Sequence, residues 1–198
     1  MTSAALKLGF LSCQESFTAM LIQALTACRV CFSRLEEAKQ LEEMDGLIMA
    51  GSDPLLLLQF MTDRGLTAPV RDRALKGMPL FGLGAGLVLM ATGTPSPWQG
   101  GLALMDLEIS REASAVGLKT IRVELSIPAL GEKPVAGDLI EKPLIKSVQP
   151  QVGIMAVYGE TVVMARQGSF LASSFYPRVD QDLRVYDYFL RMVKETWE

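Results

Sequence analysis

The chain has 198 residues, of which 49% are hydrophobic and 21% are charged, and its formal net charge is −3. This composition suits one folded domain over 1–198 and excludes an intrinsically disordered chain. Because the sequence has no basic block and no long apolar run, it predicts neither a nucleic-acid-binding protein nor a membrane protein. The cysteines are odd in number, namely Cys13, Cys28 and Cys31, which argues against a disulfide framework and favours a cytoplasmic location.

The first half of the chain alternates short apolar strands with helices. In chain order, strands are expected over 5–11, 29–33, 45–51 and from Pro79, with helices between them. Ser52 or Asp53 can cap the helix that opens at Pro54, since proline suits the first helical position. This alternation predicts a mainly parallel sheet covered by helices on both faces.

The second half is dominated by strand patterns. These are expected over 104–110, 120–127, 139–145, 154–158, 161–165 and 169–175. A final helix places Leu183, Tyr186, Leu190, Val193 and Trp197 on one face. The predicted fold is therefore an α/β, three-layer αβα sandwich with a mainly parallel central sheet and an added antiparallel region.

Three segments follow predicted strands, where α/β proteins usually place their sites. They are the residues 49–53, 81–86 and 173–178. The middle one has the order of a nucleophile elbow, in which a strand, a glycine-tight turn and a helix follow one another. Gly84 stands at this turn without a side chain, and the chain contains no histidine.

The order and the residues of these segments resemble those of the class I glutamine amidotransferases, a flavodoxin-like family. Among them, the resemblance is to the glutaminase subunits of pyridoxal phosphate synthase. There the third strand ends in Pro-Gly-Gly-Glu-Ser, the elbow reads Gly-Thr-Cys-Ala-Gly-Leu, and the last strand leads into Ser-Phe-His-Pro-Glu. The resemblance covers nearly the whole chain. It implies that the catalytic Cys, His and Glu positions are occupied by Gly84, Tyr176 and Arg178.

None of these three residues can do the work of the one it replaces. Gly84 cannot form a thioester, and a tyrosine with a pKa of about 10 is a poor general base. Arg178 cannot accept the hydrogen bond that would orient a base. We therefore expect no catalytic triad.

The substrate side of the resemblance is altered as well. Gly51 is kept, whereas Ser52 replaces a glycine that aims a backbone N–H in the family. The expected vestigial oxyanion and substrate pocket comprises Gly51, Ser52, Asp53, Ala85, Arg111 and Glu141.

These changes favour a catalytically degenerate protein with a binding or regulatory role. The expected partner is a pyridoxal phosphate synthase-like subunit or a second copy of the chain, and no cofactor is expected. The alternative is an active glutaminase in vitamin B6 synthesis, or a new hydrolase activity in the remodelled pocket.

Three other interpretations stay open. The glycines over 82–86 fit a dinucleotide loop poorly, because Leu87 stands where the third glycine belongs. Cys28 and Cys31 have redox spacing, but they lie where a helix ends, which favours buried structural cysteines. A nucleophilic serine with a lysine base is a further option, and the candidates are Ser52, Ser174, Lys119 and Lys142.

Overall fold

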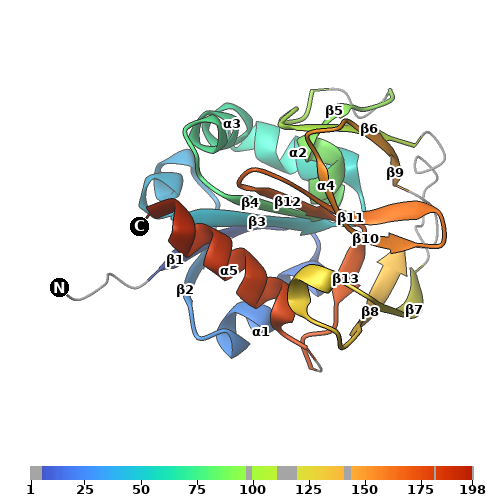
Figure 1. Cartoon of the computed structure of the whole chain (residues 1–198). Helices are drawn as coiled ribbons and strands as arrows, with labels where there is room; N and C mark the ends of the chain where they lie inside the picture. Colours follow the sequence, from blue (N-terminus) through green and yellow to red (C-terminus); the bar gives the residue numbers. More distant parts are fainter. Residues whose placement is uncertain (1–5, 97–99, 111–119, 141–143, 181, 198) are drawn as a thin grey trace.

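A central sheet separates two layers of helices in the computed structural model, which describes residues 6–96, 100–110, 120–140, 144–180 and 182–197. Helices α2, α3 and α4 lie on one face of the sheet, and α1 and α5 lie on the other (Figure 1). The predicted α/β fold with a mainly parallel sheet is confirmed.

The first half forms the alternating part of the fold. Its strands are β1 (Lys7–Leu11), β2 (Cys31–Arg34), β3 (Gly46–Gly51) and β4 (Leu80–Gly84). Its helices are α1 (Glu15–Ala27), the 3-10 helix η1 (Ala38–Glu43), α2 (Pro54–Asp63), α3 (Thr67–Leu75) and α4 (Ala85–Met90). All residues of β3 and β4 are buried, as expected for strands covered on both faces.

The second half supplies the antiparallel strands and the last helix. Its strands are β5 (Ala91–Gly93), β6 (Met105–Ile109), β7 (Thr120–Leu125), β8 (Val135–Ile140), β9 (Ile145–Val148), β10 (Gly153–Tyr158), β11 (Thr161–Gln167), β12 (Phe170–Ser173) and β13 (Phe175–Pro177). The 3-10 helix η3 (Pro128–Leu130) follows β7, and α5 (Arg184–Trp197) closes the chain.

The main sheet has the strand order β10-β11-β12-β4-β3-β1-β2. The five strands from β12 to β2 run parallel, and β10 and β11 add antiparallel pairs at one edge. Two small sheets, β13-β8-β7 and β5-β6-β9, complete the described strands. The carboxyl ends of β1, β3 and β4 therefore meet at one edge of the main sheet.

Two of the expected strands are wrong in extent, because each apolar run contributes to two different sheets. The expected strand over 139–145 contains the end of β8 and the start of β9. The expected strand over 169–175 divides into β12 and β13. At this division the Ser173 hydroxyl oxygen accepts the N–H of Phe175 at 3.0 Å, so the chain bends out of the main sheet.

Helix α5 covers the sheet with a stack of aromatic rings. The ring of Phe81 in β4 lies 5.6 Å from that of Phe189 and 6.3 Å from that of Tyr186, between ring centres. These three side chains are fully buried. Edge-to-face and tilted pairs of this kind stabilise a core beyond their buried area, so α5 is firmly attached to the central strands.

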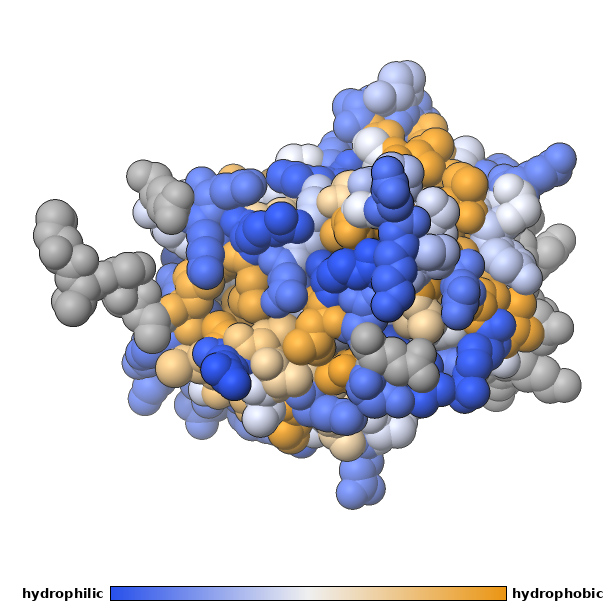
Figure 2. Space-filling view, turned by 60° about the horizontal axis from the view of Figure 1, so that its bottom comes forward, coloured by the Kyte–Doolittle hydropathy of each residue, from blue (hydrophilic) through white to orange (hydrophobic). Residues whose placement is uncertain are grey.

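The surface on the α1 and α5 side carries hydrophobic residues that are separated by hydrophilic ones (Figure 2). Within the described residues, the longest helices fall short of the length and apolar character needed to cross a membrane.

Helix α2 begins with the cap expected from the sequence. The Asp53 carboxylate accepts the N–H groups of Leu55 at 2.9 Å and Leu56 at 3.1 Å, and Pro54 occupies the first turn. Because Asp53→Ala leaves these two donors without their partner, it is expected to lower the free energy of unfolding by about 1 kcal/mol. Urea denaturation followed by circular dichroism measures the loss.

The matched control for this change is Asp63→Ala, at the opposite end of the same helix. Asp63 is exposed, and a negative charge at a helix C-terminus is unfavourable, so its removal is expected to leave stability equal or slightly higher. An equal loss from both variants would contradict the capping role of Asp53.

Candidate active site

The turn from β4 into α4 has the backbone shape of a nucleophile elbow. Gly84 has φ 56° and ψ −103°, a backbone conformation that L-residues with a side chain rarely adopt. It lies directly opposite Gly51 in the register of β3 and β4. The two glycines predicted for this site are therefore brought together, with Ala85 buried at the start of α4.

Tyr176 in β13 fills the space beside the elbow. Its side chain is only 6% exposed, and its hydroxyl donates a hydrogen bond of 2.9 Å to the carbonyl oxygen of Gly51. A Cβ atom built on Gly84 would lie 1.7 Å from this hydroxyl oxygen and 2.6 Å from the Gly51 oxygen. A side chain at position 84 and the present position of Tyr176 exclude each other.

The environment of Tyr176 keeps its hydroxyl protonated. Burial raises the pKa of the phenol well above its usual value, since the phenolate would lose its hydration. The ring packs on Phe17 of α1 with 5.2 Å between ring centres. At neutral pH, Tyr176 thus acts as a hydrogen-bond donor to the backbone.

The peptide between Gly51 and Ser52 is held from its other side by Gln14. The Ser52 N–H donates to Oε1 of Gln14 at 2.8 Å, and Nε2 of Gln14 donates to the Ser52 hydroxyl at 2.9 Å. Gln14 is the residue before α1, yet its side chain makes no cap to that helix. The N–H of Ser52 is therefore bound to Gln14, and the carbonyl oxygen of Gly51 lies beside the elbow.

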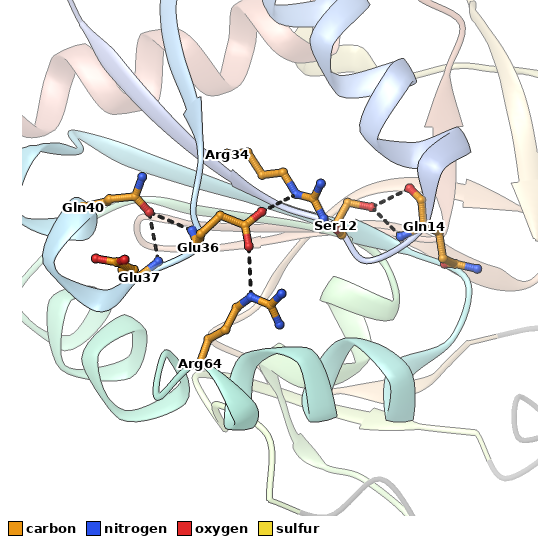
Figure 3. Close-up of polar contacts among 7 residues, drawn as sticks. All are labelled: Ser12, Gln14, Arg34, Glu36, Glu37, Gln40 and Arg64. Carbon is orange, nitrogen blue, oxygen red and sulfur yellow. Dashed lines mark hydrogen bonds and ion pairs between the residues drawn. The ribbon is translucent and has the colours of Figure 1, made fainter.

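The turn that carries Gln14 is fixed by a polar network at the same edge of the sheet (Figure 3). The guanidinium of Arg34 donates to the Ser12 carbonyl at 3.0 Å and pairs with Glu36 at 3.2 Å. Glu36 also pairs at 3.0 Å with Arg64, the residue that directly follows α2. These groups link the β1–α1 turn to the C-terminal end of α2.

Arg178 does not reach toward the elbow with a free charge. Its guanidinium makes two hydrogen bonds to Asp180, at 2.8 and 3.1 Å, and this pairing holds the pKa of the Asp180 carboxyl below its usual value. Arg178 and Tyr176 border a surface pocket of about 490 Å³. Arg111 and Glu141, which were expected in the vestigial oxyanion and substrate pocket, lie outside the described residues.

The alternative interpretations of this region lose support from the geometry. The Cβ of an alanine at position 86 would lie 2.2 Å from the carbonyl oxygen of Met49, and one at position 82 would lie 2.6 Å from the backbone of α4. These glycines are thus explained by close helix–strand packing, without a dinucleotide. Among the described residues, no three His, Cys, Asp or Glu side chains come together as a metal site.

The expectation that Cys28 and Cys31 are both buried is wrong for Cys31, which is exposed on the edge strand β2. Cys28 is half-buried, and burial together with the neighbouring Asp187 raises the pKa of its thiol to about 11. Both are free thiols. A raised pKa is the opposite of what a reactive redox cysteine needs.

The two serine candidates differ in accessibility. Ser174 is 2% exposed, and its hydroxyl donates to the Val163 carbonyl. Ser52 is half-buried at the elbow and is bound to Gln14. The two candidate bases, Lys119 and Lys142, lie outside the described residues.

The sequence did not single out Gln14 or Phe17 as part of this site. The available signal is positional, because both lie just after β1, whose carboxyl end is at the same sheet edge as Gly51 and Gly84. Only the register of β1, β3 and β4 shows that the segment after β1 lies beside Gly51 and Gly84.

Comparison with known proteins places this geometry in a family. The model of the SNO glutamine amidotransferase family matches residues 10–195. The pyridoxal 5'-phosphate synthase subunit PdxT of Desulforamulus reducens is 36% identical over 87% of this chain and 92% of its own length. PdxT of Moorella thermoacetica is 36% identical over 95% and 100%. A crystal structure of a glutamine amidotransferase superposes with a TM-score of 0.84 at 26% identity, covering 94% and 98%.

These matches correct the interpretation of the chain as a degenerate protein with a binding or regulatory role. The relatives that align over almost their full length are named as subunits of a synthase, and none of these matches marks a degenerate branch. The chain belongs to the SNO glutamine amidotransferase family, close to the PdxT subunits.

Proposed function

We propose that this protein is the glutaminase-type subunit of a pyridoxal 5'-phosphate synthase and supplies glutamine nitrogen to a synthase partner. The observation that carries the proposal is the match at 36% identity over the full length of a PdxT subunit. The retained elbow conformation at Gly84, opposite Gly51, is consistent with it. The proposal includes the cytoplasmic location that the cysteine content favours.

The proposal for the site is that Gly84, Tyr176 and Arg178 take no covalent or proton-transfer part in the reaction. Gly84 has no side chain, the Tyr176 hydroxyl is bound to the backbone, and Arg178 is paired with Asp180. The chain also lacks histidine, the usual general base of thiol-dependent hydrolysis. A test of the function therefore has to measure the final product, without relying on an acyl-enzyme intermediate.

The decisive experiment reconstitutes the synthase with two nitrogen sources. The purified chain is mixed with the other subunit of the Moorella thermoacetica synthase, and pyridoxal phosphate formation is measured with glutamine and, separately, with an ammonium salt. The expected result is glutamine-dependent synthesis at least about tenfold above that of the partner alone. Product formation only with ammonium would overturn the proposed function.

Two controls complete this experiment. PdxT of Moorella thermoacetica in place of the chain shows that the partner and substrates are competent. Size-exclusion chromatography of the mixture shows whether the two chains form a common complex. A peak that contains only copies of this chain would instead support the self-association that the sequence left open.

A further inference from the structure

One peptide unit at the elbow is held at both of its polar groups. The carbonyl of Gly51 accepts from the Tyr176 hydroxyl at 2.9 Å, and the N–H of Ser52 donates to Gln14 at 2.8 Å. The groups that hold it come from β13 and from the turn after β1, far apart in the sequence. Rotation of this peptide requires that at least one of these bonds breaks.

The same tyrosine side chain occupies the space beside Gly84. Its hydroxyl oxygen lies where the first side-chain atom at position 84 would be, and its ring is packed on Phe17. The elbow is thus filled from within the chain by a buried aromatic residue.

We infer that Tyr176 is a lock on the elbow: in the isolated chain its phenol pins the Gly51–Ser52 peptide, and its withdrawal opens the space beside Gly84 to a small ligand. The lock follows from the geometry alone, whereas the identity of the ligand rests on the proposed function. Tyr176 is in this sense a positioning residue, because it acts through the backbone of Gly51.

A surface pocket adjoins Tyr176. The pocket of about 490 Å³ that Tyr176 borders is also lined by Met20, Gln23 and Arg122. Met20 and Gln23 belong to α1, which also carries Phe17. In the proposed withdrawal, the phenol leaves the elbow toward this pocket.

The chemistry of the lock defines the ligand that replaces it. When the phenol leaves, the Gly51 carbonyl loses its donor, and a buried carbonyl without a donor is unfavourable. A ligand that restores the bond must carry an N–H or O–H group. The primary carboxamide of glutamine has such a donor, whereas the side-chain carboxylate of glutamate is an acceptor only.

The first test measures amide hydrogen exchange at Ser52 in the full chain without ligand or partner. Y176F keeps the ring but removes the hydroxyl, and it is expected to raise the exchange rate at Ser52 about fivefold, the effect of one lost buried hydrogen bond. The matched control is Y186F, because the buried Tyr186 hydroxyl has no partner among the described residues. Equal exchange at Ser52 in Y176F and Y186F would overturn the lock.

The second test measures binding of L-glutamine by calorimetry. Y176A, which removes the ring, is expected to bind L-glutamine at least about tenfold more tightly than the wild type and more tightly than it binds L-glutamate. Y176F still fills the elbow and is expected to show no such gain. Equal glutamine affinity of Y176A and the wild type, or no preference over glutamate, would overturn the assignment of the ligand.

These results are separate from a failure of the proposed function. The exchange measurement uses no substrate and needs only the isosteric Y176F variant, so an unstable alanine variant does not affect it. The synthase assay uses only the wild-type chain and its partner. If Y176F raises exchange at Ser52 but the wild-type chain supports no glutamine-dependent synthesis, the proposed function is rejected and the lock is kept. If synthesis is supported but Y176F leaves exchange unchanged, the lock is rejected and the proposed function is kept.

Discussion

Gly84→Ala is expected to lower the free energy of unfolding by about 3–4 kcal/mol, combining backbone strain with steric overlap. The φ of 56° and ψ of −103° are unfavourable for alanine, and the new methyl group would lie 1.7 Å from the Tyr176 hydroxyl oxygen. The carbonyl oxygen of Gly51, at 2.6 Å, adds a second overlap with an atom of a central strand. Chemical denaturation of the purified variant measures the loss.

Two further variants separate the contributions to this loss. Gly65→Ala is the matched control, because Gly65 has a similar φ of 61° but no atom within 4 Å of an added Cβ, so only about 1 kcal/mol is expected. In a Tyr176→Ala background, Gly84→Ala should cost about 1–2 kcal/mol less than in the wild type, since one of two overlaps is gone. Additive effects at positions 84 and 176 would contradict the mutual exclusion.

Gly86→Ala is expected to destabilise the protein by about 3 kcal/mol, although it lies in a helix. Helix propensity alone predicts a gain of about 1 kcal/mol for this change. The overlap dominates, because the added methyl group would lie 2.2 Å from the carbonyl oxygen of Met49 in the buried strand β3. This oxygen belongs to a paired strand, so α4 would have to move away from the sheet.

The matched control for Gly86 is Gly153→Ala in the edge strand β10. There the added Cβ would meet the Arg166 carbonyl oxygen at 3.5 Å, an ordinary contact at an exposed position. Its expected effect is within about 0.5 kcal/mol. If Gly86→Ala unfolds at the same denaturant concentration as this control, close packing of α4 on β3 is not the reason for the glycine.

The alternating first half of the fold was predictable because its signals are local. Short apolar strands, the Asp53 cap and the glycine-rich turn at 82–86 each depend on neighbouring residues. The strands expected over 139–145 and 169–175 were wrong in extent for the opposite reason. Apolar periodicity shows that such residues are buried, but it does not show that Ser174 separates two strands that belong to different sheets.

The structure brings several of the expected site residues together, and their assignment to a pocket stays a prediction. Gly51, Ser52, Gly84 and Tyr176 do lie together, as the resemblance implied. The regulatory role inferred from their side chains was wrong, because the relatives are named as synthase subunits. The identity of three side chains is a narrower basis for assigning a function than similarity along the entire chain.

By itself, the sequence determined the α/β class, the elbow turn, the absence of histidine and the membership implied by its collinear motifs, because these depend only on composition and residue order. Only the tertiary structure decided that the Tyr176 hydroxyl binds the Gly51 carbonyl and that Gln14 holds the N–H of the same peptide unit. These contacts join residues up to 125 positions apart. The contact of Gln14 arises from the register of the parallel strands, which places the carboxyl ends of β1, β3 and β4 at one edge of the main sheet. Tyr176 comes from β13, which pairs with β8 in a separate sheet, and no local pattern encodes how this sheet packs against the elbow.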